Sequence, residues 1–446
     1  MPVIRAAASG AFWSIGIGVG ARVVGLVGTL AITHYLSPEV MGEVAAATIL
    51  AMTAGWLSHW GFNQYVIVKG GESSDGVFHA TVLHLLLGFV AIGIVLLLAD
   101  RFTSFLNAPN LGEYLPGMAL VVIIKRFGSI PDKLLVRDMR FKYIALASGA
   151  GELAYISLAV ALVVTTDLGG HAIVIANILQ ALIVTTAVMR GAGLARWLAP
   201  RPWRWQRVGE ILRFGAPIGM ESILFETGRQ WDKLMFSRFF GPHVTGMYSL
   251  SYNLSDLPAT HIGEHVGTVL VPTMVNIEPS RRNQVFAEAC GLLALVVMPM
   301  AVGLAGVAET LVKVLLSPEW QGVADFLGVL AAIAVLRPFT AAIYSFLIAS
   351  GRTWPLLWFE VLKIIVMFGG IALLAPYGAV VAASALPIAL AVQLSAGLVV
   401  LSRHGFPVAT LFAQLRGPAL AAASIAAAVL PLREAFSATD VNLVVG

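Results

Sequence analysis

About thirteen stretches of roughly 20 mainly apolar residues follow one another along this chain, with only short polar connections between them. A run of this length spans the hydrocarbon core of a bilayer, where only helices and closed barrels satisfy their own backbone groups. Hydrophobic residues make up 58% of the 446 and charged residues 12%, about half the charged share of a soluble protein. The sequence therefore predicts an all-α, polytopic membrane protein of about 13 (12–14) transmembrane helices. The predicted spans lie near residues 11–35, 38–62, 77–99, 112–134, 142–165, 170–190, 208–236, 242–275, 285–307, 322–350, 354–376, 378–401 and 408–431.

One short segment of the chain occurs twice. Tyr35-Leu36-Ser37-Pro38-Glu39-Val40-Met41-Gly42 returns as Phe239-Phe240-Gly241-Pro242-His243-Val244-Thr245-Gly246, and each copy joins one apolar stretch to the next. Internal duplication in a very hydrophobic chain is typical of transporters built from two related halves around a central site. We predict two parallel-repeat six-helix bundles around a central cavity, residues 1–200 and 201–403, followed by a further transmembrane segment at 404–446.

The basic residues predict the orientation. With a cytoplasmic N-terminus, the outer loops hold only Arg101, Arg238, Lys313 and Arg433, and most other loop arginines and lysines lie inside. Because positive charge favours the cytoplasmic side, the N-terminus is expected there. The pI near 9.2 then reflects membrane orientation and implies no nucleic-acid partner. The basic segment 190–213 is expected to link the halves, with Trp197, Trp203 and Trp205 at the headgroup boundary.

Charged residues inside the spans predict a polar cavity. A charge at the centre of a membrane helix costs about 2.5–3.5 kcal/mol, so these side chains should line a wet cavity, pair, or reach an interface. The seventh span places its charges on one face at helical spacing, and the excess of cations favours an anionic substrate. Substrate-binding roles are assigned to Arg22, Lys125, Arg126, Arg229, Lys233 and Arg337. Ion-coupling or charge-balancing roles are assigned to Glu221, Glu226, Asp232, Asp256 and Glu264. Purely structural salt bridges are the alternative, and they are favoured for Glu360 and Lys363.

Other motifs carry less weight. His261-Ile262-Gly263-Glu264-His265 matches a zinc-peptidase pattern, but it lies in a predicted span without an identifiable further ligand. The single cysteine, Cys290, cannot form an intrachain disulfide, and the chain has no Walker lysine motif. No metal and no cofactor are expected, although coupling to H⁺ or Na⁺ is possible.

Four segments resemble the Wzx-like polysaccharide flippases of the multidrug/oligosaccharidyl-lipid/polysaccharide (MOP) exporter superfamily. They are Gly228–Met235, Phe239–Pro242, Gly246–Leu254 and Ile130–Phe141. By position, Asp232 resembles the acid of the family's seventh-helix motif and Tyr248 the aromatic residue of the eighth. The resemblance implies a flippase in the bacterial inner membrane that moves undecaprenyl-diphosphate-linked oligosaccharide by alternating access, for O-antigen, capsule or exopolysaccharide synthesis. A polysaccharide polymerase and a chain-length regulator would be its partners.

Two other functions within the superfamily remain open, a lipid II flippase and an exporter of small molecules or drugs. An O-antigen polymerase or ligase is disfavoured because the outer connections are short and no catalytic constellation is present. A transporter, and not an enzyme, is therefore expected.

Overall fold

The structure is a computed structural model that describes residues 20, 24–57, 60–69, 74–352 and 354–438. Within these ranges every predicted span is helical and no strand occurs, so the all-α prediction is confirmed. The first predicted span is helical over residues 24–32. Arg22 lies outside the described residues.

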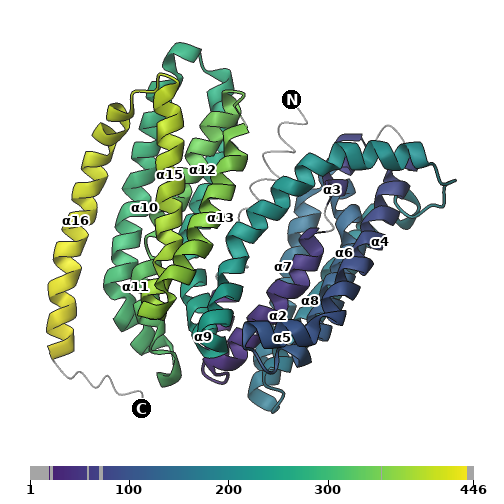
Figure 1. The fold of residues 1–446 in the computed structure, drawn as a ribbon, viewed down its shortest axis with the longest axis horizontal. Coiled ribbons are helices and arrows are strands. Elements are labelled where there is room, and N and C mark those ends of the chain that lie inside the picture. The colour runs from purple at the N-terminus through teal and green to yellow at the C-terminus, as the bar shows by residue number, and fades with distance from the viewer. Residues whose placement is uncertain (1–19, 21–23, 58–59, 70–73, 353, 439–446) are drawn as a thin grey trace. The chain divides into compact units, whose positions relative to one another are not determined.

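The chain forms two compact units, residues 1–246 and 247–446. Unit 1 is built around α6 (Leu111–Arg137), which packs on α2 (Pro38–Leu57), α3 (Phe62–Lys69), α4 (Ser74–Leu97) and α8 (Gly170–Ala192) (Figure 1). The short α5 (Ala99–Leu106) precedes α6, and α7 (Phe141–Thr165) packs on α8. An apolar core that includes Leu50, Leu115 and Ile173 fills the space between α2, α6 and α8.

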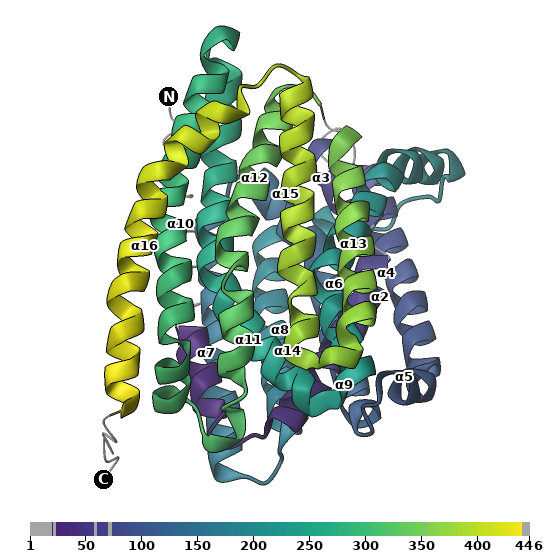
Figure 2. The same ribbon diagram turned by 60° about the vertical axis from the view of Figure 1, so that its left-hand side comes forward.

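Unit 2 contains a second set of packed helices. Here α10 (Pro279–Leu315) packs on α12 (Ile333–Ala349) and α16 (Val408–Ala438), and α15 (Ala385–Arg403) packs on α12 and on α13 (Trp354–Leu374) (Figure 2). The short α11 (Val323–Leu330) meets α12 at a bend of 41°, and α14 (Ala379–Ala383) precedes α15. The core includes Phe286, Phe346 and Phe406, whose rings lie edge to face or tilted.

The long helix α9 (Trp205–Asn276) is two helices joined at a break, and the compact units divide within it. Gly241 has φ 77° and ψ 177°, a conformation that glycine adopts without steric penalty. Pro242, which follows it, has no N–H to continue the helical ladder. The break therefore lies in the second copy of the duplicated segment, just as α2 begins at Pro38 of the first copy. The division at residue 246 separates two compact units. It does not test where the second sequence repeat begins, so the predicted boundary near residue 200 stays a prediction.

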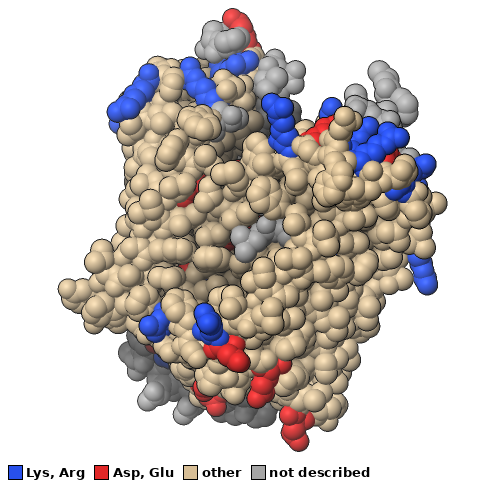
Figure 3. Space-filling model, turned by 45° about the vertical axis from the view of Figure 1, so that its right-hand side comes forward, with Lys and Arg blue, Asp and Glu red and all other residues tan. Residues whose placement is uncertain are grey.

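Seven helices within the described ranges are long and apolar enough to cross a membrane, or eight if the bent pair α11–α12 is one span. Other helices carry more charged residues than a purely apolar membrane span does. Helix α6, for example, contains Lys125, Arg126, Asp132 and Lys133. On the face shown in Figure 3, charged side chains gather at the upper and lower margins and the surface between is nearly uncharged. A multi-pass membrane protein is thus confirmed, whereas the number thirteen stays a prediction.

The linker before α9 is attached to unit 1 by side chains. The imidazole of His79 accepts a hydrogen bond at Nε2 from the Arg204 N–H (2.9 Å) and stacks on Trp203. Trp203 and Trp205 are exposed, as expected for the headgroup boundary, but Trp197 is only 1% exposed. The expectation for Trp197 was wrong because its ring packs into the core with Val208 and Ile211.

A bidentate ion pair joins the linker to the end of α6 and gives a pH-dependent prediction. Arg196 donates from Nη1 and Nη2 to the Asp138 carboxylate, at 2.6 and 3.1 Å. This hydrogen bonding lowers the pKa of Asp138 below its ordinary value. Because the pKa is lower in the folded protein than in the unfolded chain, where it is about 4, the ionised carboxylate stabilises the folded state at pH values above the unfolded pKa. This stabilisation is lost as the pH falls through the folded-state pKa.

We expect Asp138→Asn to remove this acid-sensitive contribution. Both side chains are a third or more exposed, at 33% and 44%, so the loss at neutral pH should be at most about 1 kcal/mol. Thermal unfolding of the two purified proteins between pH 3 and 7 measures the effect, and their midpoints should converge below pH 4. Midpoints that keep a constant separation at all pH values would contradict the assignment.

Candidate functional site

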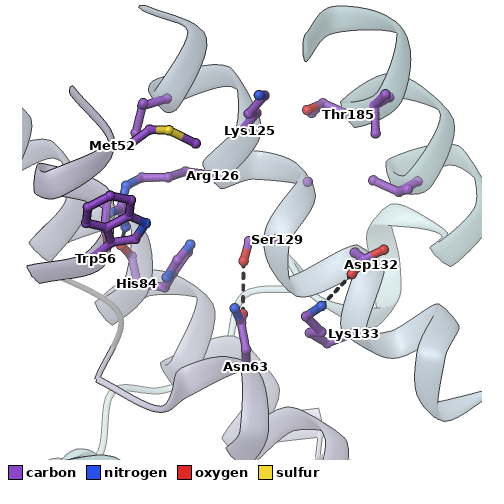
Figure 4. A pocket seen from close by; sticks show the side chains of 15 residues that line it. Met52, Trp56, Asn63, His84, Lys125, Arg126, Ser129, Asp132, Lys133 and Thr185 are labelled. Carbon is purple, nitrogen blue, oxygen red and sulfur yellow. Dashed lines mark hydrogen bonds and ion pairs between the residues drawn. The ribbon is translucent and has the colours of Figure 1, made fainter. Parts of the chain in front are cut away.

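Unit 1 contains a cavity of about 370 Å³ within its own helices (Figure 4). The helices α2, α3, α4, α6 and α8 all contribute to its wall, and α6 contributes most. This volume lies in the range of small-molecule sites, about 300–1,000 Å³. The lining includes the side chains of Met52, Trp56, Asn63, His84, Lys125, Arg126, Ser129, Asp132, Lys133 and Thr185.

Lys125 is the accessible cation of this cavity. Its side chain is exposed and makes no hydrogen bond or ion pair with any residue that the structure describes. Glu152 on α7 interacts with it electrostatically, but one oxygen of that carboxylate accepts a hydrogen bond from Gln180 Nε2 at 2.6 Å. Lys125 therefore presents its charge to the cavity.

Arg126, the next residue, is 4% exposed and engaged by backbone oxygens. Its guanidinium donates to the carbonyls of Gly55 and His84, both at 2.9 Å, and to that of Ala54 at 3.3 Å. Gly88 on α4 makes room, since a Cβ there would overlap the guanidinium. In Figure 4 the side chain extends toward Trp56 and His84 and away from Lys125.

Three further polar contacts lie in the cavity wall, beside apolar side chains such as Met52, Val122 and Val184. Ser129 Oγ donates to Asn63 Oδ1 at 2.9 Å, and Lys133 Nζ donates to Asp132 Oδ2 at 2.7 Å. Thr185 Oγ1 donates to the Ile124 carbonyl at 3.1 Å. The Lys133 charge is thus compensated, and the ring of Trp56 adds an apolar surface. Sequence reasoning missed these neutral polar and aromatic residues, because only charge marks a site in an apolar sequence.

The charges of the seventh span divide into different environments. Asp232 is fully buried and Lys233 is 7% exposed, with its Nζ donating to Gln230 Oε1 at 3.0 Å. Glu221 is exposed, and Glu226 and Arg229 are half-buried. The Arg229 guanidinium lies 5.6 Å from the centre of the Phe225 ring. None of these residues is among the described lining of the unit 1 cavity, so their assigned roles stay predictions.

Two ion pairs in unit 2 join charged side chains within the predicted spans. Arg337 on α12 pairs through Nη1 with the Asp256 carboxylate, and its Nη2 donates to the Tyr252 hydroxyl at 2.8 Å. Lys363 pairs with Glu360, which also accepts from Tyr344 Oη at 2.9 Å and from Gln393 Nε2 at 3.0 Å. Glu360 and Lys363 are each 5% exposed, in agreement with the structural role favoured for them. Glu264, like His261 and His265, lies in the helical backbone of α9, and its side chain is outside the described part.

The class of protein is defined first by the fold. A solved structure of the lipid II flippase MurJ, in an inward closed conformation, matches with a TM-score of 0.71, at 14% identity over 96% of this chain and 99% of that one. An inward-facing MATE family multidrug resistance transporter of the MOP superfamily matches with a TM-score of 0.65, at 14% identity over 91% and 95% of the two chains. At such identity the likeness shows the fold alone, and the fold is that of the MOP transporters.

The family is shown by sequence. The sequence model of the family described as "Polysaccharide biosynthesis protein" matches residues 32–325, and the chain belongs to this family. The succinoglycan biosynthesis transport protein ExoT of Rhizobium meliloti is 27% identical over 82% of this chain and 73% of its own length. The lipopolysaccharide biosynthesis protein WzxC of Escherichia coli is 24% identical over 77% and 70%. The predicted resemblance to the polysaccharide flippases of the MOP superfamily is therefore confirmed, and with it a transporter class in place of an enzyme.

Proposed function

We propose that this protein is a flippase that moves a polyprenyl-diphosphate-linked oligosaccharide across the cytoplasmic membrane by alternating access. The observation that carries the proposal is the unit 1 cavity, in which the Lys125 ammonium makes no ion pair with a described residue and lies beside polar, aromatic and aliphatic side chains. The family and its relatives in polysaccharide biosynthesis support the glycan part of the substrate.

The chemistry of the cavity suits a phosphorylated or acidic glycan. An ammonium is a compact, strongly hydrated charge that binds phosphate or carboxylate oxygens without fixed geometry. A partly water-excluded site strengthens this attraction relative to bulk water. Trp56 can pack on the apolar face of a sugar ring, while Asn63, Ser129 and Thr185 offer hydrogen-bonding groups to its hydroxyls. The polyprenyl tail would remain in the surrounding lipid.

Coupling to H⁺ or Na⁺ belongs to the same proposal. The carboxylates available for it are those of the seventh and eighth spans: Glu221, Glu226, Asp232, Asp256 and Glu264. The inner-membrane location, the cytoplasmic N-terminus, and a polymerase and chain-length regulator as partners are also parts of this proposal. Their support is the distribution of basic residues and the resemblance to the flippases.

Deletion of the gene followed by complementation tests the function. Loss of surface polysaccharide in the deletion strain, restored by the wild-type gene, is the expected result, and undecaprenyl-linked repeat units should accumulate inside. Arrest of growth with intact surface polysaccharide would favour a lipid II flippase instead. Changed drug resistance with intact polysaccharide would favour a small-molecule exporter. Either of these outcomes would reject the proposal.

A further inference from the structure

Glu152 is a carboxylate near the middle of α7, and none of the roles assigned above falls on it. Helix α7 is one of the helices long and apolar enough to cross a membrane. Apart from Lys142 at its start, Glu152 is the only charged residue in the sequence of this helix, and its side chain is half-buried. A charged group at this depth is costly unless it has a partner or lies beside a polar cavity, so it marks a position with a function.

The carboxylate of Glu152 is held in place by its neighbours. Gln180 on α8 donates a hydrogen bond from Nε2 to Glu152 Oε2 at 2.6 Å. The other oxygen, Oε1, faces the backbone of the first predicted span, because a Cβ at Gly25 would lie 3.0 Å from it. The negative charge therefore has a fixed position between α7, α8 and the first span.

This fixed charge lies just behind the wall of the unit 1 cavity. Gly151, the preceding residue, packs closely on α8, since a Cβ there would lie 2.4 Å from Val184 Cγ2 and 3.4 Å from Gln180 Cγ. Val184 lines the cavity, and Gln180 lies one turn before it on the same face of α8. Lys125 lines the cavity as well, and its ammonium interacts electrostatically with Glu152. Glu152 therefore lowers the positive potential of the cavity, while the ammonium of Lys125 stays accessible.

A fixed negative charge at this place acts on any anion that binds to Lys125. The anion is attracted by the ammonium and repelled by the carboxylate behind it, so its net affinity is lower than the ammonium alone would give. A transport site must bind its ligand strongly enough for entry and weakly enough for departure. A carboxylate that is close to the cavity, but does not occupy the lysine, meets the second requirement without removing the first.

We propose that Glu152 is an affinity-setting residue, a fixed counter-charge behind Lys125 that weakens the binding of the transported anion and so permits its release. The proposal rests on the transport function proposed above, with Lys125 as the anion-binding group. Gln180 is a positioning residue in this arrangement, because its hydrogen bond keeps the carboxylate beside the cavity. The role differs from ion coupling, which is proposed for carboxylates of the seventh and eighth spans.

The variant Glu152→Gln tests the proposal, because it removes the charge and keeps an oxygen that can accept from Gln180. The purified variant should bind farnesyl diphosphate, a short isoprenoid diphosphate, about tenfold more tightly than wild type. Its affinity for farnesol, the uncharged analogue, should be unchanged. Surface polysaccharide in a complemented deletion strain should fall severalfold, because the anion leaves more slowly. Glu152→Asp keeps the charge and should stay near wild type, and Asp100→Asn, at an exposed carboxylate of α5, is the control.

A purely structural contact between α7 and α8 gives a different result. A Glu152→Gln protein with a lower thermal midpoint, and with diphosphate binding that is unchanged or weaker, would overturn the proposal. Tighter binding together with normal export would also overturn it, because release would then not depend on this charge. Glu152→Met, a neutral side chain of similar length that needs no hydrogen bond, is subject to the same measurements if the Glu152→Gln protein does not fold.

The two proposals fail separately. If wild-type protein neither restores polysaccharide nor binds farnesyl diphosphate, the proposed function is rejected. If wild-type protein does both, and the Glu152→Gln protein binds the diphosphate no more tightly, only the role of Glu152 is rejected.

Discussion

Replacing Lys125 by glutamine is expected to abolish most surface polysaccharide while the amount of membrane-inserted protein stays unchanged. The Lys125 ammonium faces the unit 1 cavity without an ion pair to any described residue, so its removal breaks no such pair, and the Glu152 carboxylate that interacts with it electrostatically keeps its hydrogen bond from Gln180. A hydrogen bond to a charged group contributes about 1.5–3 kcal/mol. Anion binding should therefore weaken by about 10- to 100-fold. Quantified surface polysaccharide in a complemented deletion strain, with membrane protein level measured in parallel, checks the expectation.

Two further variants at lysines sharpen this test. Lys125→Arg keeps the positive charge and should retain part of the export. Lys313→Gln removes an exposed lysine whose ion pair, within the described residues, is with Glu309 on the surface, and it should behave as wild type. Purified Lys125→Gln protein should keep its thermal midpoint but lose stabilisation by farnesyl diphosphate. Normal polysaccharide in the Lys125→Gln strain would remove the unit 1 cavity from the transport mechanism.

The positions of the helices could be predicted because a bilayer leaves the backbone few choices. The predicted spans 142–165 and 170–190 correspond to α7 (Phe141–Thr165) and α8 (Gly170–Ala192) almost to the residue. The break inside the span predicted at 38–62 was not foreseen, because Trp60 and Phe62 on either side of Gly61 keep the stretch apolar. At this break Gly61 has a positive φ of 65°, a conformation that glycine adopts without steric penalty.

The charged residues of the site could be predicted, but their partners could not. The acceptors of Arg126 are backbone carbonyls, which every residue carries, so no sequence pattern marks them. Lys125 and Arg126 are neighbours in sequence, yet successive residues of a helix point about 100° apart, and only one of the two faces the open cavity. In the seventh span, Glu221 and Asp232 share a face by angle but lie roughly 16 Å apart along the axis. Their burial therefore differs completely.

The two copies of the duplicated segment lie against each other, a contact that the sequence alone did not reveal. A Cβ at Gly42 would overlap the carbonyl oxygen of Pro242 and lie 2.9 Å from the Gly246 nitrogen. A Cβ at Gly246 would overlap the carbonyl oxygen of Pro38 and lie 3.0 Å from its Cα. The contact is reciprocal, since Pro38 corresponds to Pro242 and Gly42 to Gly246. Glycine is needed at both positions because backbone, and not a movable side chain, occupies the space.

Gly42→Ala and Gly246→Ala are therefore each expected to reduce folded protein severely. Overpacking a close contact destabilises a protein by about 1–3 kcal/mol and occasionally more. Because backbone atoms lie opposite each glycine and cannot move aside as a side chain can, both variants should lie at the upper end of this range of destabilisation. Because the two glycines share one contact, the double variant should cost less than the sum of the single ones. The controls are Gly93→Ala in α4 and Gly209→Ala in α9, where a Cβ meets no atom within 4 Å and alanine favours the helix. Thermal midpoints and the yield of monodisperse protein in detergent measure the difference, and Gly42→Ala and Gly246→Ala proteins as stable as the controls would contradict the close contact of the two copies.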